Sequence, residues 1–262
     1  MAGLSALGAT VQRADPDRFF TALLAPPERR ETLLLLYAFN HELARAREVA
    51  SQPLLALIRL QWWREVVEGA SRRHAVAEPL AAAIATGELA ADDLAAMIDG
   101  REAEAAPAIA DTAAWRGYVG ATSGRLAVAA GRALGAGAAL LPRLEALGTA
   151  YGVAGQVRRA RALAAEGRCL LPLDLLGAHG LTAEAVTARP DDPRLAPVLA
   201  ELAGWGRGLL AGMAGALPRP VIAAALPAVL ARRDLRRPDA APGPRRLGDR
   251  AAVLAAWLAG RI

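Results

Sequence analysis

The stretch PPERRETLLLLYAFNHELARAREVASQPLLALIRLQWWREVVEG, residues 26–69, decides the fold that the sequence predicts. Its two opening prolines suit the first turn of a helix, where a missing backbone N–H costs nothing. Pro53 interrupts the helical pattern, because the residue before a proline disfavours the α-helical conformation, and Gly69 ends it. We therefore expect a hairpin of two helices, spanning about 29–49 and about 54–68.

The first arm of this hairpin is unusual, because residues 33–39 are apolar on all sides. A helix that is apolar all round is buried on every side. The same arm ends in polar residues, among them His41, Arg45 and Glu48. Polar groups at the far end of a buried helix are placed where they can line a cleft.

The rest of the chain continues the helical pattern, and no run of alternating β-branched residues indicates a strand. Further helices are predicted at 75–85, 92–104, 112–134, 141–165, 174–179, 182–186, 194–217, 220–233 and 249–259. Asp92 and Asp93 are expected to cap one of them and Pro107 to end it. Gly120 and Gly124, inside a predicted helix, indicate close packing against a neighbour. We expect one all-α domain over 1–262, a helical bundle with a frayed N-terminus at 1–14 and a mobile loop at 236–248.

The composition supports a sizeable core, with 54% hydrophobic and 22% charged residues. The net charge is +5, and all the basic residues are arginine. This charge permits contact with an anionic surface but does not require it. No basic block interleaved with aromatic residues is present, so no nucleic-acid partner is predicted.

The single cysteine, Cys169, cannot form an internal disulfide, and no zinc-type spacing occurs. The first twenty residues lack the long apolar core of a secretory signal. The longest apolar segments are well short of the ~20 residues that a spanning helix needs. We expect a cytoplasmic protein, with peripheral contact at the inner face of the membrane as an extension of that prediction.

Common catalytic motifs, including the nucleotide-binding glycine loops and the zinc-protease helix, are absent. What remains is a set of polar residues on two predicted helices. Tyr37, His41 and Glu48 share one face of the first helix at helical spacing. The second carries Gln156 and Arg159 and is followed by Glu166 and Arg168.

The order of several short segments resembles the squalene/phytoene synthase family, the head-to-head prenyl synthases of all-α fold. The matching segments are YAFNHELARARE (37–48), LQWWREVVEG (60–69), IDGRE (98–102), YVGATSG (118–124), GVAGQ (152–156) and GRCLLPLDLL (167–176). They span most of the chain in the family's order. The resemblance implies an isoprenoid-synthase-like bundle around a central apolar cavity.

The resemblance also implies two aspartate-rich motifs that hold Mg²⁺ on a prenyl diphosphate, since Mg²⁺ prefers carboxylate oxygen. This chain departs from both motifs. In the first, the adjacent acids fall on Ala44 and Arg45, and only the last acid survives, as Glu48. In the second, Gln156 matches but the Asn and Asp positions fall on Arg159 and Leu163. We therefore expect no metal and no other cofactor, with Mg²⁺ required only if the chain is a synthase.

The pattern is more similar to divergent, non-catalytic members of the family, which include the mitochondrial assembly factor of respiratory complex I. This similarity implies a protein that binds an isoprenoid or phospholipid, or that acts on a respiratory-complex subunit during assembly. The alternative is a prenyl transferase that condenses isoprenyl diphosphates head to head with a degenerate metal site. The candidate ligand-binding residues are Tyr37, His41, Arg45, Glu48, Gln156, Arg159, Glu166 and Arg168, and no catalytic residue is assigned.

Two interpretations of the arginines in this set remain open at this stage. Arg45 and Arg159 replace the family's ligand positions, so each could point inward and bind phosphate oxygens directly, without a metal. The other interpretation is a solvated lattice of salt bridges that closes the cleft implied by the resemblance. In that lattice Arg45 pairs with Glu42 or Glu48, and each pair stabilises the helix by ~0.2–0.5 kcal/mol.

Overall fold

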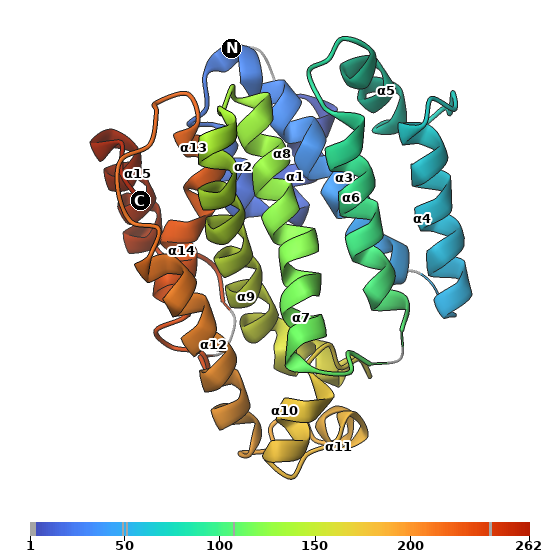
Figure 1. Cartoon of the computed structure of the whole chain (residues 1–262), viewed down its shortest axis with the longest axis vertical. Helices are drawn as coiled ribbons and strands as arrows, with labels where there is room; N and C mark the ends of the chain where they lie inside the picture. Colours follow the sequence, from blue (N-terminus) through green and yellow to red (C-terminus); the bar gives the residue numbers. More distant parts are fainter. Residues whose placement is uncertain (1–3, 49, 51, 107, 241–242) are drawn as a thin grey trace.

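The computed structural model describes residues 4–48, 50, 52–106, 108–240 and 243–262, and these residues contain helices and no β-strand (Figure 1). The predicted all-α class is confirmed. The helices are α1 Ala6–Ala14, α2 Pro16–Ala22, α3 Arg30–Glu48, α4 Pro53–Val67, α5 Ala77–Ala85, α6 Ala91–Glu102, α7 Thr112–Val119, α8 Arg125–Ala133, α9 Leu141–Ala165, α10 Leu173–Ala178, α11 Ala183–Ala188, α12 Leu195–Ala211, α13 Ile222–Ala225, α14 Pro227–Asp234 and α15 Leu247–Ala259. Shorter helical turns lie at Pro27–Arg29, Ala103–Ala105 and Ala138–Leu140, and a π-helical turn, η3, at Gly120–Gly124.

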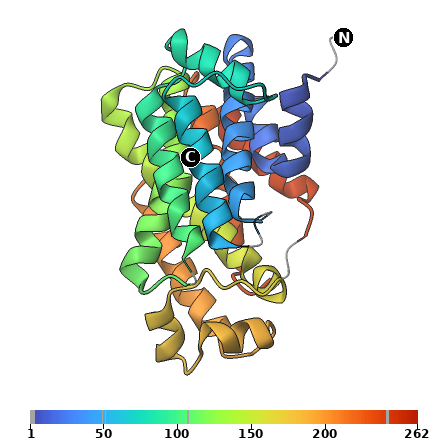
Figure 2. The ribbon, with the colours of Figure 1, turned by 90° about the vertical axis from the view of Figure 1, so that its right-hand side faces the viewer.

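The predicted hairpin is present as α3 and α4, and its first arm is buried as expected. The side chains from Leu33 to Phe39 are at most 5% exposed. Figure 2 shows α3 between α4 and the first two helices, and α3 also packs on α5 and α8. The apolar part of α3 is therefore covered on several sides, whereas its polar C-terminal turns are partly open to solvent, with Arg45 and Glu48 exposed.

The long helix α9 is the second axis of the bundle and packs against α8, η3, α12 and α14. Its small residues allow this close approach. A Cβ atom at Gly148 would collide with the Ala127 side chain and lie 2.6 Å from the carbonyl oxygen of Ser123. A Cβ atom at Gly152 would lie 2.6 Å from the Cβ of Ser123. The backbones of α9 and η3 are therefore in direct contact.

The predicted helix over 112–134 is interrupted by the π turn η3 between α7 and α8. Close packing was expected at Gly120 and Gly124 and is confirmed at Gly124, where a Cβ would lie 2.5 Å from Oγ1 of Thr149 on α9; at Gly120 the same oxygen would lie at 3.9 Å, an ordinary contact. Single π turns inside helices occur frequently at functional sites, because the extra residue changes where the neighbouring side chains point. Here Ser123 of η3 faces the cavity described below.

Several of the predicted helix boundaries differ from those in the structure, some by more than one helical turn. The helix predicted over 194–217 ends at Ala211, and Gly215 follows with a φ of +138° that a glycine adopts without strain. The helix predicted over 220–233 is divided at Pro227, which cannot donate a helical N–H. Asp92 and Asp93 lie in the first turn of α6 rather than at its cap, which is Ala90. The break predicted at Pro107 falls outside the described residues.

The two ends of the chain also differ from expectation. Residues 6–14, expected to be frayed, form α1, and the Ser5 hydroxyl caps it by accepting from the Gly8 amide at 3.0 Å. The segment 236–248, expected to be a mobile loop, is tied to the bundle by Arg245, whose side chain is 13% exposed. None of the helices in the described ranges is both long and apolar enough to cross a bilayer.

Candidate functional site

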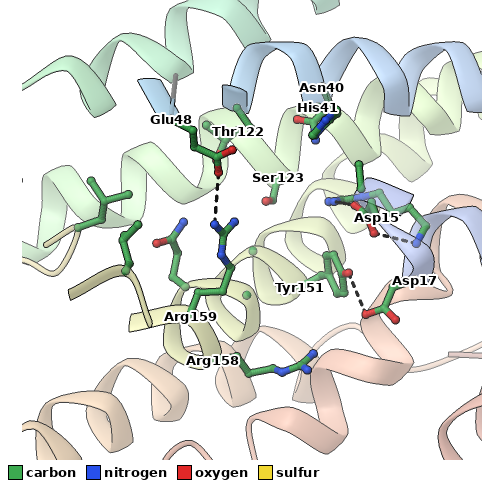
Figure 3. Close-up of a pocket in the computed structure, with 18 of the residues that line it drawn as sticks. Asp15, Asp17, Asn40, His41, Glu48, Thr122, Ser123, Tyr151, Arg158 and Arg159 are labelled. Atoms are coloured by element: carbon green, nitrogen blue, oxygen red, sulfur yellow. Dashed lines mark hydrogen bonds and ion pairs between the residues drawn. The ribbon is translucent and has the colours of Figure 1, made fainter. Parts of the chain in front are cut away.

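A cavity of about 570 Å³ lies between α3, η3 and α9 and is closed on one side by the α1–α2 segment and Arg245 (Figure 3). Its wall contains charged side chains from distant parts of the chain. The lining residues are Ala14, Asp15, Pro16, Asp17, Arg18, Tyr37, Asn40, His41, Ala44, Glu48, Arg101, Glu104, Tyr118, Thr122, Ser123, Tyr151, Gly152, Gly155, Gln156, Arg158, Arg159, Leu163, Arg168, Leu170, Gly243, Pro244 and Arg245.

The cavity wall combines apolar surface with many charged side chains, so it is more polar than the apolar cavity that the resemblance implied. The two leucines, Leu163 and Leu170, are its only large aliphatic residues among the described lining, against six arginines and four carboxylates. Phe39 and Leu36 of α3 are fully buried in the core, as expected for the apolar run 33–39. The bundle centre is filled with side chains, because the deeper positions of α3 carry large residues.

Each of the four lining carboxylates forms an ion pair with an arginine. The pairs are Asp15–Arg18 at 2.8 Å, Asp17–Arg245 at 2.7 Å, Glu48–Arg159 at 3.3 Å and Glu104–Arg101 at 2.6 Å. Two more arginines of the cavity wall, Arg158 and Arg168, are not part of these four pairs. Arg158 pairs with Asp234 of α14 at 3.3 Å. Among the described residues, the carboxylate nearest to Arg168 is that of Glu104, at 4.0 Å.

A buried polar network forms the floor of the cavity around Glu104, which is 6% exposed. Its Oε1 accepts hydrogen bonds from Tyr118 Oη at 2.7 Å and from Arg101 Nη1 at 2.6 Å. Gln156 Nε2 donates to Tyr118 Oη at 3.1 Å, and Arg101 Nη2 donates to Asn40 Oδ1 at 3.0 Å. Burial, followed by the charge of Glu104, raises the pKa of Tyr118 well above its ordinary value, so this phenol stays protonated and donates.

A second cluster on the wall surrounds Arg18, whose side chain lies against two tyrosine rings. Its guanidinium carbon is 4.7 Å from the ring centroid of Tyr151 and 5.8 Å from that of Tyr37. Tyr151 Oη donates to Asp17 Oδ2 at 3.2 Å (Figure 3). Burial raises the pKa of Tyr37 to about 12 against the opposing effect of Arg18. This cluster fixes α2 against α3 and α9.

Six of the eight predicted site residues line this cavity: Tyr37, His41, Glu48, Gln156, Arg159 and Arg168. The structure therefore brings together side chains from both predicted helices. Their role in binding is not tested by this placement and stays a prediction.

Arg45 and Glu166 do not line the cavity, which corrects the prediction of an inward Arg45. Residues 37, 41, 44 and 48 share the inward face of α3, and Arg45 lies about 70° from the centre of that face, at its edge. Its Nη1 instead bonds Glu42 Oε1 at 3.1 Å, and its side chain is 45% exposed. Glu166 follows the last turn of α9 and is exposed. The pairing predicted for a salt-bridge lattice, Arg45 with Glu42, is the one observed.

Much of the cavity wall is formed by residues that were not predicted, although the sequence contains a signal for some of them. Arg101 and Tyr118 lie in IDGRE and YVGATSG, two of the segments that carried the family resemblance. Asp15 and Asp17 directly follow the segment 1–14 that was expected to be frayed, and Arg245 lies in the segment that was expected to be a mobile loop. No local pattern indicates that Arg245 meets Asp17, 228 positions away.

The comparisons with known proteins agree with this architecture. The family model described as Squalene/phytoene synthase matches residues 11–257, which is nearly the whole chain. The chain belongs to the squalene/phytoene synthase family. The predicted resemblance is therefore confirmed.

Solved structures of the same family share the fold. A squalene synthase, HpnC from Alicyclobacillus acidocaldarius, superposes with a TM-score of 0.65 and 19% identity, covering 97% of this chain and 92% of that chain. A dehydrosqualene synthase in complex with ligand gives a TM-score of 0.76 and 12% identity, covering 97% and 94%. At this identity the likeness concerns the helical fold alone.

Curated relatives carry a different name, NADH dehydrogenase (ubiquinone) complex I, assembly factor 6. The mouse protein is 26% identical over 231 residues, covering 84% of this chain and 68% of that protein. The human protein is 34% identical over 58 residues, covering 22% of this chain and 17% of that protein. The alignment with the human relative thus spans less than a fifth of its length.

The Mg²⁺ that the synthase fold implies does not fit the residues present here. Among the described residues, no three His, Cys, Asp or Glu side chains are grouped so that they could hold a metal ion. At the motif positions, Glu48 is paired with Arg159, and Ala44 and Leu163 have no oxygen ligand to offer. An arginine at a cation site repels the ion electrostatically, and no step through Mg²⁺ is derived for this cavity.

Proposed function

We propose that this protein is a non-catalytic member of the squalene/phytoene synthase family that works by binding. The observation that carries the proposal is the pairing of all four described cavity carboxylates with arginines at 2.6–3.3 Å. Ionisation of a prenyl diphosphate needs cations that neutralise the leaving group, and these cations need free carboxylate oxygen. In this cavity the carboxylates already neutralise guanidinium groups.

The biological role proposed for this binding protein is the assembly of a respiratory complex, in which it contacts a complex subunit. Support comes from the relatives named as complex I assembly factors, one of which aligns over 84% of this chain. The loss of the metal ligands agrees with this role, because an assembly factor needs the fold and its surfaces but no diphosphate chemistry.

The ligand class that best suits the cavity is a phosphate or diphosphate head group, carried by an isoprenoid or a phospholipid. Arg168 is the best-placed cation, with a side chain 17% exposed and its nearest described carboxylate at 4.0 Å. Arg159 lies at the mouth, 62% exposed. Guanidinium groups bind phosphate oxygen through paired charge-assisted hydrogen bonds. The polar wall of the cavity would hold the phosphate head group. The apolar tail of the isoprenoid or phospholipid would then extend out of the cavity through its opening.

The catalytic alternative is tested directly by incubating the purified full chain with Mg²⁺ and farnesyl or geranylgeranyl diphosphate. We expect pyrophosphate release at the level of a protein-free blank. Release that depends on both protein and Mg²⁺ would contradict the proposal and support a prenyl transferase.

Binding is tested by titrating the protein with a fluorescent prenyl phosphate analogue, with and without EDTA. A parallel titration uses inorganic pyrophosphate as the ligand. Binding should survive EDTA and weaken with added salt. Arg168→Gln with Arg159→Gln should weaken it by roughly tenfold, since each removes a charged hydrogen-bond donor. The matched control is Arg45→Gln, which removes the same group outside the cavity and should leave affinity unchanged. Pyrophosphate binding comparable to that of the analogue would identify the head group as sufficient.

The role in assembly is tested by deleting the coding sequence in its host. We expect less assembled respiratory complex on native gels and lower NADH:quinone oxidoreductase activity, both restored by the wild-type chain. Normal complex levels in the deletion strain would rule out this role without affecting the result of the binding titration.

A further inference from the structure

The last described helix, α15, lies at the outer edge of the bundle (Figure 1), and an apolar stripe along it is exposed. Leu247, Leu254 and Leu258 are 86%, 38% and 64% exposed. Together with Ala251 they share one face, because spacings of four, three and four residues return to the same side of a helix. The opposite face holds the helix in place, with Val253 fully buried and Trp257 Nε1 donating to the Leu24 carbonyl at 2.9 Å.

The stripe lies in the most basic part of the chain. Residues 219–261 contain nine arginines and three aspartates, a net charge of +6 against +5 for the entire protein. The rest of the chain therefore carries a net charge of −1. The exposed arginines of this segment are Arg219, Arg233, Arg236, Arg237, Arg246, Arg250 and Arg261.

Two of the three acids of the same segment pair with arginines outside α15: Asp234 with Arg245 at 2.7 Å and Asp239 with Arg161 of α9 at 2.6 Å. Asp249 pairs with Arg233 at 2.6 Å and accepts from the Arg246 amide at 2.9 Å, so it offsets one of the exposed arginines. Positive charge lies next to the stripe, because Arg246 directly precedes Leu247, Arg250 lies on α15 itself, and Arg219 donates to the carbonyl oxygens of Trp257 and Leu258 at 2.7 and 2.6 Å.

A second exposed apolar patch lies on α4, where Leu54, Leu55, Leu57 and Ile58 are 63%, 43%, 38% and 56% exposed. Arg59 is exposed beside it, and further along the face of Leu54 and Ile58 the helix carries Gln61, Glu65 and Glu68. Because α4 carries charges of both signs, an anionic partner should favour α15, and the two patches can be compared within one protein.

We propose that the exposed face of α15 binds the surface of a membrane that contains anionic phospholipid. An amphipathic helix that lies in the head-group plane inserts its apolar side and places basic residues among the phosphates. Leucines supply the apolar area, and each arginine near an anionic surface strengthens binding by roughly fivefold. The inference is independent of what the cavity binds.

The test is co-sedimentation of the purified full chain with vesicles of phosphatidylcholine alone and of phosphatidylcholine with phosphatidylglycerol. We expect binding to the anionic vesicles that falls with salt, because exposed charges are screened, and little binding to neutral ones. The triple variant Leu247→Gln, Leu254→Gln, Leu258→Gln should lower binding at least tenfold. Circular dichroism and thermal unfolding check that it folds like the wild type.

The matched control is Leu54→Gln with Ile58→Gln on α4, which removes exposed apolar area of the same kind and should leave vesicle binding unchanged. Wild-type protein that does not bind anionic vesicles would overturn the proposal and leave a protein partner as the occupant of this face. Equal binding by the folded α15 variant and the wild type would overturn it as well.

Discussion

Glu48 and Arg159 form a salt bridge across the mouth of the cavity, with Oε1 of Glu48 3.3 Å from Nη2 of Arg159 (Figure 3). One residue is the surviving acid of the first motif on α3, and the other replaces an amide of the second motif on α9. The positions that the family resemblance assigns to cation binding are here joined by a direct ion pair. Opposite charges on facing helices thus replace a metal-mediated contact.

Removal of Glu48 should release Arg159 for an anionic ligand. We predict that Glu48→Gln tightens binding of the prenyl phosphate analogue several-fold, the opposite of Arg159→Gln. The pair is largely exposed, so either change should alter the free energy of unfolding by less than about 1 kcal/mol. Affinity titrations and urea denaturation check both parts, and weaker binding by Glu48→Gln would contradict the prediction.

Of the two adjacent tryptophans on α4, Trp63 should matter most for stability. Trp63 is 4% exposed and meets the ring of Phe39 edge-on at 5.3 Å, whereas Trp62 is only half-buried. We expect Trp63→Ala to lower the free energy of unfolding by ~3–5 kcal/mol, because it leaves a large cavity in the core. Trp62→Ala is the control and should cost clearly less in urea denaturation. A free energy of unfolding close to that of the wild type for Trp63→Ala would contradict this prediction.

The close contact between α9 and η3 requires glycine at position 148. An added Cβ would press against the Ser123 carbonyl at 2.6 Å, and backbone cannot easily move away. We predict that Gly148→Ala lowers the free energy of unfolding by about 1–3 kcal/mol through overpacking. Gly155→Ala on the same helix meets no atom within 4 Å and should be neutral or stabilising by up to about 1 kcal/mol. Thermal unfolding of both variants distinguishes packing from helix propensity, which would affect them alike.

Asp192 should make the free energy of unfolding depend on pH in the acid range. Its carboxylate accepts from the Arg194 guanidinium at 2.8 Å and from the Arg194 amide at 2.9 Å, and these bonds lower its pKa to about 2. The unfolded chain takes up this proton first, at a pH near the ordinary value of about 3.9. The stabilisation is therefore present above about pH 4 and is lost as the pH falls toward 2.

Asp192→Asn should consequently be less stable than the wild type at pH 7, and the difference should shrink between pH 4 and pH 2. Urea denaturation across this range measures it. Asp191→Asn is the control, since the Asp191 side chain is 95% exposed. A stability difference that stays constant with pH would show that the Asp192 effect is not electrostatic.

Local sequence patterns were enough to predict the helical class, the buried arm α3 and the family. These features depend on the apolar run of residues 33–39 and on short motifs in a fixed order. A helix that is apolar all round is buried on every side. The helical spacing of Tyr37, His41 and Glu48 likewise predicted a shared face of α3, and that face meets the cavity.

The tertiary structure alone decided the character of the cavity. The salt bridge from Arg245 to Asp17 joins residues 228 positions apart, and the arginine reaches it only because α14 and α15 return past α2. Arg45 lies at the edge of the inward face, about 70° from its centre, so whether it turns inward or pairs with Glu42 depends on which partner is nearer. An arginine has several partners of similar energy within reach, and only the path of the whole chain selects one of them.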